Sequence, residues 1–414
     1  MFFQWVRCRP VRGEVGKRRR SSGGVVALGR RLLRRAAWSV LSKTLAVMTH
    51  LLRRQRLVVV NGFPALEGNA VQIVRELQDR YDGRITWIDA PSERELSNLD
   101  FVLAPHVRTA KYWSFAALSS YVVAETIFYT HGLYGNPRLA PSRSVVNLWH
   151  GHGIKRVDYP GYATHLVVPT QLHAETRASA FRVDPANVLI ALPPRTARLR
   201  EPATATALTR LGLSGKPFVV WMPTYRKAAV KEGTNDGWVS TAEDVGGRST
   251  TQAIQDGFDV LRARGIEVVV KAHPADTLNR HVPGALNISS DVLTAAGTTL
   301  YNVLGASAGL ITDYSSVWFE YFAIRKPIAY FMPDKVEYVS TRGVVPGDAL
   351  DWLPGPELVA ADDFNRLADE ILSGRCFEEH RERSSEHFGL VDEWPSQGSV
   401  LDELARRRLI RLHQ

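Results

Sequence analysis

The 414-residue sequence has only two cysteines, Cys8 and Cys376, which stand far apart in the chain. Isolated thiols argue against a disulfide framework or a cysteine metal site, and they fit a reducing, cytoplasmic setting. No GxxxxGK[ST] loop occurs, and no GxGxxG follows the first expected strand, residues 57–63. ATP-driven and nicotinamide chemistry are therefore poorly supported. No HExxH pair or carboxylate cluster accompanies the histidines, so we expect no metal and no cofactor.

The composition is that of a globular protein, with 45% hydrophobic and 23% charged residues. The length suits two domains of ordinary size. The net charge of +10 is unevenly placed. Residues 1–56 hold fifteen Lys and Arg against one acid, whereas the remainder has 37 basic and 41 acidic residues. Because the basic charge belongs to the N-terminal arm and not to the folded body, we expect no nucleic-acid partner.

The arm itself divides into two parts. Residues 1–29 are rich in Arg and Gly without hydrophobic periodicity, which predicts disorder. Residues 30–56 place apolar side chains at three- and four-residue steps among Arg and Lys, which predicts a basic amphipathic helix on an anionic membrane surface. The interrupted apolar stretch is too short to span a bilayer, and a signal peptide is less well supported. Alternatively, translation starts at Met48 and the arm is not part of the natural protein.

From residue 57 the chain alternates short apolar runs with helical spacing, which predicts an α/β protein with parallel, doubly wound sheets. Strands are expected at 57–63, 84–89, 101–105, 121–125, 145–151, 165–169, 188–192, 218–223, 267–274, 309–314 and 327–332. Helices are expected near 69–81, 171–181, 251–264, 299–306, 364–373 and 400–411. Two Rossmann-like domains facing across a cleft would then occupy 57–195 and 217–396, with a linker at 196–216, a long loop at 226–249 and a C-terminal helix within 397–414.

The chain is organised around the stretch LITDYSSVWFEY, from Leu310 to Tyr321. A buried strand that ends in Asp-Tyr-Ser-Ser and becomes a helix at Ser315 or Ser316 presents free N–H groups, two hydroxyls and the positive end of the helix dipole at one point. Such a point binds phosphate. The plainer alternative is that Ser315 is simply an N-cap.

Three other polar clusters follow expected strands, where the cleft should lie. LWHGHGIK contains His150, His152 and Lys155; the others are PTYR, ending at Arg226, and KAHP, with Lys271 and His273. Two histidines at strand ends in different domains favour function over a structural role. A diphosphate held by the helix start, Arg226 and Lys271 is the best-supported ligand.

In this order, WHG with a glycine turn and Lys, PTYR, KxHP, ITDYSSVWFEY and LPGPEL resemble the CDP-glycerol:poly(glycerophosphate) glycerophosphotransferases, over roughly residues 121–364. The resemblance implies a GT-B fold, CDP-glycerol or another CDP-polyol as donor substrate, and a lipid-linked or polymeric acceptor in teichoic-acid-like polymer synthesis. It also implies a peripheral place on the cytoplasmic face of the plasma membrane.

Carried over residue by residue, the resemblance makes His150 the general base for the acceptor hydroxyl. His273 would contact the diphosphate and stabilise charge as CMP leaves. The donor phosphates would be held by Ser315 and Ser316. Asp313, placed with the donor phosphates, would either orient a histidine or cap the turn. On the acceptor side would stand His152 and Lys155.

Two departures from the family pattern fall on the acceptor half. HGHGIK replaces the usual HGTPLK, and PPRTARL (193–199) only loosely follows a Gly-x-Pro-Arg-Asn-Asp turn. These differences leave the acceptor and the polyol open. Glycerol phosphate is the default transferred group, with ribitol phosphate or another polyol or sugar phosphate as alternatives. Two other functions stay open: a GT-B glycosyltransferase using a CMP- or UDP-activated sugar, and a non-catalytic membrane-associated scaffold.

Overall fold

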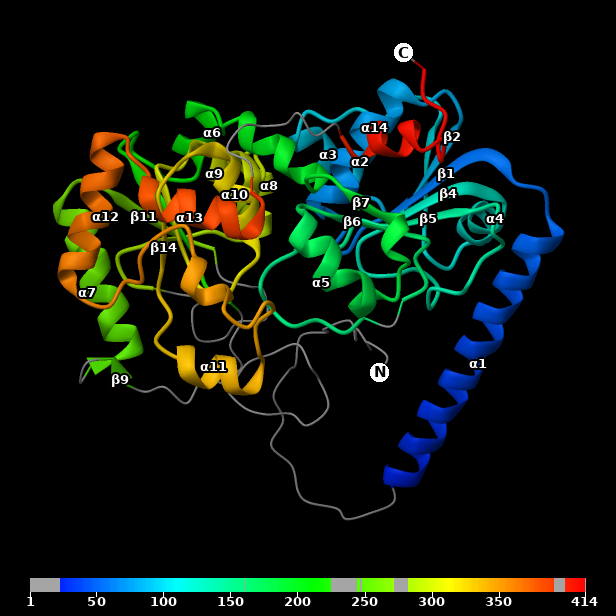
Figure 1. The fold of residues 1–414 in the computed structure, drawn as a ribbon. Helices are drawn as coiled ribbons and strands as arrows, with labels where there is room; N and C mark the ends of the chain where they lie inside the picture. Colours follow the sequence, from blue (N-terminus) through cyan, green and yellow to red (C-terminus); the bar gives the residue numbers. More distant parts are fainter. Residues whose placement is uncertain are drawn as a thin grey trace.

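The computed structural model describes residues 23–159, 161–224, 244–245, 248–271, 282–390 and 399–413. Two parallel sheets, each flanked by helices, form the two halves of the body, and a long N-terminal helix projects from the first half (Figure 1). The predicted α/β class with two facing parallel sheets is therefore confirmed.

The first sheet has seven parallel strands in the order β3-β2-β1-β4-β5-β6-β7. The strands are β1 (Gln55–Asn61), β2 (Arg84–Ile88), β3 (Val107–Ala110), β4 (Ala124–Tyr129), β5 (Ser144–Asn147), β6 (His165–Val168) and β7 (Val188–Ile190). Its helices are α2 (Gly68–Arg80), α3 (Glu93–Asn98), α4 (Phe115–Val123), α5 (Gln171–Phe181) and the 3₁₀ turn η1 (Pro185–Asn187). Val58 and Val60 pack in one core cluster and Val59 in another, so both faces of the sheet are covered, as continuous apolar strands require.

The second sheet has five parallel strands in the order β12-β11-β8-β13-β14. The strands are β8 (Phe218–Met222), β11 (Glu267–Val270), β12 (Leu286–Asn287), β13 (Gly309–Thr312) and β14 (Ile328–Tyr330). Its helices are α7 (Thr250–Ala263), α8 (Ser290–Ala295), α9 (Leu300–Ala306), α10 (Val317–Tyr321), α11 (Lys335–Thr341), α12 (Ala361–Ser373) and α13 (Glu378–Phe388), with 3₁₀ turns η3 (Phe322–Ile324) and η4 (Ala349–Trp352). A short antiparallel pair, β9 (Asp244–Val245) and β10 (Arg248–Ser249), precedes α7.

Two expected strands of the first half are wrong. Residues 101–105 are irregular, and Phe101 packs its ring against Trp87 in the core. Residues 121–125 mostly belong to α4, because the Ser114 side chain accepts a hydrogen bond from the Ala117 amide and so starts a helix upstream. The real strand β4 begins only at Ala124.

The segment expected to be a linker has secondary structure of its own. It contains η2 (Pro194–Arg200) and α6 (Ala205–Arg210). The C-terminal helix α14 (Val400–Arg406) returns to the first half, where Leu401 and Leu404 are fully buried in its core (Figure 1). Most of the expected long loop at 226–249 lies outside the described residues.

Helix α1 (Gly23–Leu51) begins seven residues before the expected helix. Trp38, Leu41 and Leu45 pack against the first half, which uses part of the apolar surface that was predicted for a membrane. The opposite side keeps Val47 56% and Leu51 76% exposed. Among the described helices, none combines the length and apolar character that crossing a membrane requires.

Candidate active site

The loop after β5 and the turn after β13 touch at the junction of the two halves. A Cβ placed on Gly151 would lie 2.2 Å from the Ser316 Oγ, and one placed on Gly153 would lie 2.9 Å from the Ser316 Cα. Only glycine permits this approach without displacing the turn. The structure therefore brings together two of the predicted clusters, WHGHG and DYSS.

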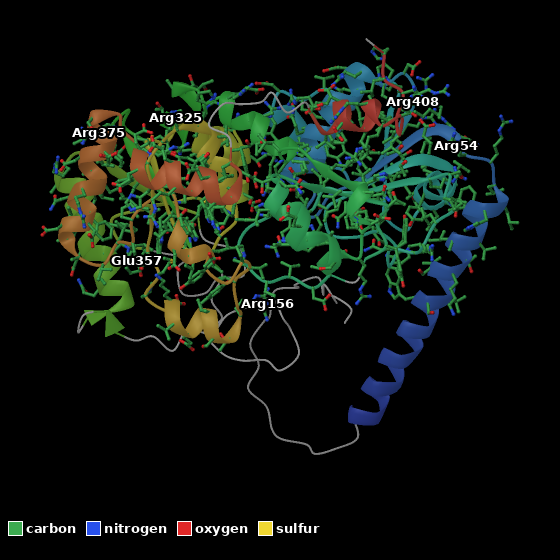
Figure 2. All side chains as sticks on the ribbon, viewed as in Figure 1. Arg54, Arg156, Arg325, Glu357, Arg375 and Arg408 are labelled. Atoms are coloured by element: carbon green, nitrogen blue, oxygen red, sulfur yellow. The ribbon has the colours of Figure 1, made fainter. Side chains whose placement is uncertain are left out.

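The end of the same loop is held by the second half. The Val345 amide donates to the Ile154 carbonyl at 2.7 Å, and Ile154 is buried in the core of the second half. Lys155 is half-buried and forms an antiparallel bridge with Val344. Figure 2 shows Arg156 at the boundary between the halves, where its amide donates to the Gly343 carbonyl at 3.2 Å.

Ser315 and Ser316 lie at the start of α10 and are half-buried. Ser316 occupies the N-cap position, and within the described part of the chain its side chain makes no capping hydrogen bond. The buried rings of Trp318 and Phe319 stack on each other at 3.6 Å and anchor the helix. The alternative of Ser315 as the N-cap is therefore wrong for this structure, and the Ser316 hydroxyl is not used to cap the helix.

Asp313 caps the turn, one of the two roles considered for it. Its carboxylate is 1% exposed and accepts hydrogen bonds from the Thr224 amide at 2.8 Å and the Thr224 hydroxyl at 2.5 Å. It also accepts from the Ser315 amide at 3.2 Å. A buried carboxylate would repel a phosphate, so we expect Asp313 to act on a donor only by shaping the turn. Its prediction as a direct phosphate ligand stays a prediction.

His150 contacts two aromatic rings. Its imidazole stacks on His131 with centroids 4.1 Å apart and planes 7° apart, and it lies 4.2 Å from Trp149. The side chain stays exposed to solvent even though protein atoms crowd around it. Partial burial and the nearby His131 and Arg195 lower the pKa of His150 below its ordinary range. A ring that stays neutral near pH 7 can accept a proton.

His131 is a site residue that the sequence analysis missed. It follows β4, the strand beside β5, and burial lowers its pKa to about 4. The sequence does contain a signal for it, because Thr-His-Gly follows an apolar run just as the other polar clusters do. The strand was expected at 121–125, which ends too early in the chain for His131 to stand at its end. Parallel neighbouring strands end at the same edge, which places the two histidines side by side.

His152, predicted on the acceptor side, points away from solvent. It is 3% exposed, and neither ring nitrogen makes a hydrogen bond within the described residues. The nearby Val167 backbone acts to raise the pKa of the ring. Burial and the Arg177 cation lower its pKa to about 3. The Arg177 guanidinium donates to the Gly153 carbonyl. His152 and Arg177 therefore support the loop from its buried side. Direct acceptor contact by His152 stays a prediction.

Lys271 directly follows β11, the strand beside β8; it is half-buried, and burial lowers its pKa. It therefore lies at the same sheet edge as the DYSS turn. Arg226 and His273, the other two predicted donor-site residues, lie outside the described residues. Their roles stay predictions.

Arg195 joins both halves and was also missed. Its guanidinium donates to both Glu320 oxygens, at 2.9 and 2.6 Å, and to Glu67 at 3.3 Å. Burial lowers the pKa of Arg195, but Glu320 and Glu67 outweigh burial and raise it. The Arg195 amide donates to Asn69, whose side chain donates to the Trp149 carbonyl at 3.0 Å. This network fixes the backbone just before His150.

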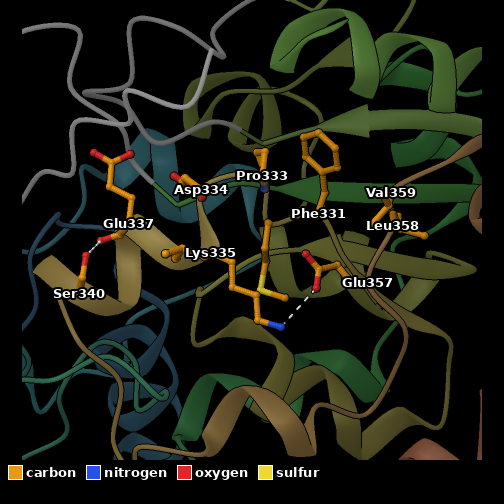
Figure 3. A pocket seen from close by; sticks show the side chains of 11 residues that line it. Phe331, Pro333, Asp334, Lys335, Glu337, Ser340, Glu357, Leu358 and Val359 are labelled. Atoms are coloured by element: carbon orange, nitrogen blue, oxygen red, sulfur yellow. Dashed lines mark hydrogen bonds and ion pairs between the residues drawn. The ribbon is translucent and has the colours of Figure 1, made fainter. Parts of the chain in front are cut away.

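A cavity of about 690 Å³ lies at the carboxyl end of β14 (Figure 3). Its lining is mostly apolar, and Lys335 pairs with Glu357 at 3.3 Å along its wall. The Tyr314 hydroxyl donates to Asp334 at 3.0 Å, and Asp334 lines the cavity. This hydrogen bond links the wall of the cavity to the DYSS turn. The cavity has the size of a small-molecule site.

Comparisons with known proteins agree with this geometry. Residues 44–392 match the family described as CDP-glycerol:poly(glycerophosphate) glycerophosphotransferase. Teichoic acid ribitol-phosphate primase of Bacillus spizizenii is 41% identical over 76 residues, 18% of each chain. Teichoic acid glycerol-phosphate primase of Bacillus subtilis is 37% identical over 102 residues, 25% of each chain. The matches thus span a quarter or less of these two primases.

The fold is that of a solved polymerase. A structure of the wall teichoic acid polymerase TagF has a TM-score of 0.64 at 18% identity and covers 93% of this chain and 98% of its own. A TagF variant soaked with CDPG gives 0.63 at 19% identity, covering the same shares. The fold agreement and the match over 349 of the 414 residues confirm the resemblance read from the motifs. The chain belongs to the CDP-glycerol:poly(glycerophosphate) glycerophosphotransferase family.

Proposed function

We propose that the protein transfers a polyol phosphate, by default glycerol phosphate, from a CDP-polyol to a hydroxyl of a lipid-linked or polymeric acceptor and releases CMP. The observation that carries the proposal is the contact between the His150 loop and Ser316, in a chain that belongs to this family. The contact supports the proposal because an imidazole can act as a base and a helix start can bind phosphate, and the loop of one approaches the start of the other.

In the proposed reaction the acceptor oxygen attacks the phosphorus that carries the polyol. A new phosphodiester bond forms, the bond from that phosphorus to the CMP phosphate breaks, and CMP leaves with the electron pair. The acceptor proton passes to His150. Base catalysis of this kind is typically worth about 10²–10⁴-fold.

The second half supplies the donor side. Ser316 meets the Gly151–Gly153 loop at the junction, and Lys271 lies at the same sheet edge. The hydroxyls of Ser315 and Ser316 and the amides of the first α10 turn are proposed to hold the donor phosphates. Arg226 and His273 are proposed to complete the diphosphate site. The cavity beside β14 suits the nucleoside end of the donor, because apolar walls for the base and a few polar groups are what such a ligand requires.

A donor panel tests the proposal. The full chain is incubated with a lipid-linked acceptor and CDP-glycerol, CDP-ribitol, a CMP-sugar or a UDP-sugar, and released nucleotide is measured. We expect CMP release from a CDP-polyol, lost by about 10²–10⁴-fold in His150→Asn. His413→Asn, an exposed histidine near the C-terminus and outside α1, is the control and should match the parent. Turnover of an activated sugar alone would favour a glycosyltransferase, and an unchanged His150→Asn would remove the base assignment.

We further propose that the protein works peripherally on the cytoplasmic face of the plasma membrane, bound to anionic lipid. The basic charge of residues 1–56 and the exposed side of α1 support this. Near that helix, Trp113 is 60% and Phe115 is 85% exposed, and Trp113 meets Trp38 of α1 edge to face at 5.2 Å. Aromatic side chains of this kind favour the interface between water and lipid.

Vesicle binding tests this placement without disturbing the fold. Deleting all of α1 would remove Leu45, which is 4% exposed, and would uncover the core cluster against which it packs. We therefore choose Val47→Glu with Leu51→Glu instead. We expect this variant to lose binding to phosphatidylglycerol vesicles and to keep turnover of a soluble acceptor. Binding that is unchanged in the variant, or insensitive to salt in the parent, would contradict the proposal.

A further inference from the structure

The stacked pair His131–His150 points to a second functional histidine. The two rings are nearly parallel, with 7° between planes and 4.1 Å between centroids, a closer and flatter arrangement than the tilted contact of His150 with Trp149. The His150 side chain is exposed, whereas His131 follows β4 directly and is half-buried. The more buried ring thus supports the ring that is proposed to do chemistry.

His131 is itself held on several sides. Its Nδ1 lies 3.0 Å from the Thr130 hydroxyl, which also accepts the Phe63 amide at 3.2 Å. The Tyr159 hydroxyl donates to the His131 carbonyl at 2.8 Å. The Phe63 ring meets the imidazole edge to face at 5.8 Å. These contacts come from the segments that follow β1, β4 and β5, so they define both the position and the plane of the ring.

We infer that His131 is a positioning residue: its fixed ring sets the plane of the His150 imidazole at the junction with the DYSS turn. The inference rests on the proposed function for the role of His150 as base, but the placement of the ring can be measured without catalysis. A base must meet its proton within hydrogen-bond reach, and an error of about 1 Å can cost roughly 10²-fold.

Stacking also bears on protonation. Two adjacent imidazoles oppose each other's positive charge, and His150 is faced in addition by Arg195, Lys155 and the His152 ring. His131 is faced by Arg195. Burial is the largest cause that lowers the pKa of both rings, and these neighbouring groups lower it further. The stack therefore adds to burial in favouring the neutral form of His150 that a base requires.

Two substitutions separate positioning from chemistry. His131→Phe keeps a flat ring against His150, and we expect kcat within about threefold of the parent. His131→Ala removes the stack and admits water; we expect kcat to fall at least tenfold and the acidic limb of the pH–rate profile to move up toward the ordinary histidine pKa of about 6.5. His165→Phe is the matched control, because His165 is also buried with its Nδ1 on the preceding threonine, 2.8 Å from Thr164, and lies on β6.

A second readout is independent of turnover. In ¹³C-histidine-labelled full chain, the His150 signal, assigned with His150→Asn, should carry an upfield ring-current shift that His131→Ala removes and His165→Phe leaves. Equal loss of activity in the Phe and Ala variants would overturn positioning, because the imidazole itself would then be needed. An unchanged His150 signal in His131→Ala would also overturn it. If the parent releases no CMP while the His150 signal moves as expected, the proposed function fails and the positioning stands.

Discussion

Replacing Arg195 by alanine is expected to destabilise the protein by about 3–5 kcal/mol, because it leaves two buried carboxylates without their cation. The Arg195 side chain is 13% exposed, and the side chains of Glu67 and Glu320 are 5% and 2% exposed. Water can therefore do little to replace the lost partner. For a unit of about 150–250 residues, roughly 3 kcal/mol lowers Tm by about 6–12 °C.

The loss should depend on pH with a definite sign. Burial already raises the pKa of Glu67, against the opposing effect of Arg195. A carboxyl whose folded pKa is above its unfolded value binds protons more tightly when folded, so stability is gained as pH falls and lost as pH rises through the folded pKa. Without Arg195 the pKa of Glu67 rises further. The Tm difference between parent and Arg195→Ala should therefore be larger at pH 8 than at pH 5.

Thermal unfolding followed by circular dichroism at both pH values measures this. Arg264→Ala is the matched control: Arg264 pairs with Asp369 at 2.6 Å, but the two side chains are 36% and 56% exposed. An exposed pair contributes about 0–1 kcal/mol, so its Tm should barely change. Equal Tm losses in the two variants, or a loss in Arg195→Ala that is the same at both pH values, would refute the reasoning.

Three further predictions concern the loop and the turn. Gly153→Ala should raise the donor KM and lower stability by about 1–3 kcal/mol by pressing on Ser316, whereas Gly347→Ala, whose Cβ meets no described atom within 4 Å, should change neither. Asp313→Asn should cost about 1–3 kcal/mol in chemical unfolding and raise the donor KM, because the turn loses its charged acceptor; an unchanged KM would separate the turn from donor binding. His152 has a lowered folded pKa, so its contribution to stability falls as pH drops below about 6.5; His152→Phe should flatten the fall in Tm between pH 7 and pH 5, and an unchanged slope would contradict this.

The sequence was sufficient for the parts of the site that depend on sheet topology. Apolar runs followed by polar clusters indicated strands, and parallel strands share one edge for their carboxyl ends. That reasoning placed the WHG loop and the DYSS turn in one cleft, and Gly151 does contact Ser316. This prediction required only the correct order of strands and helices. Errors of a few residues at the ends of the elements do not change that order.

Two kinds of feature could not be predicted from the sequence. The first depends on whether a segment forms a helix or a strand, and the second depends on contacts between residues far apart in the chain. Tyr121-Val122-Val123 reads equally as strand or helix, and the cap at Ser114 decides for helix. Because β4 was placed too early, His131 was not recognised at its end. Arg195 was noted only within a loosely matching turn, since its partners Glu67 and Glu320 are 128 and 125 residues away along the chain.

The loop that carries His150 belongs to neither half alone. Its start is tied to the first half through the Asn69 side chain on the Trp149 carbonyl, and its end is tied to the second half through the buried Ile154. Only Gly151, His152 and Gly153 separate His150 from that second anchor. The distance between base and phosphate turn is therefore set by how the halves dock, and Arg195, which bridges them, controls the base without touching it in any described hydrogen bond. Stability of the junction and placement of the imidazole therefore depend on the same buried ion pairs of Arg195 with Glu67 and Glu320.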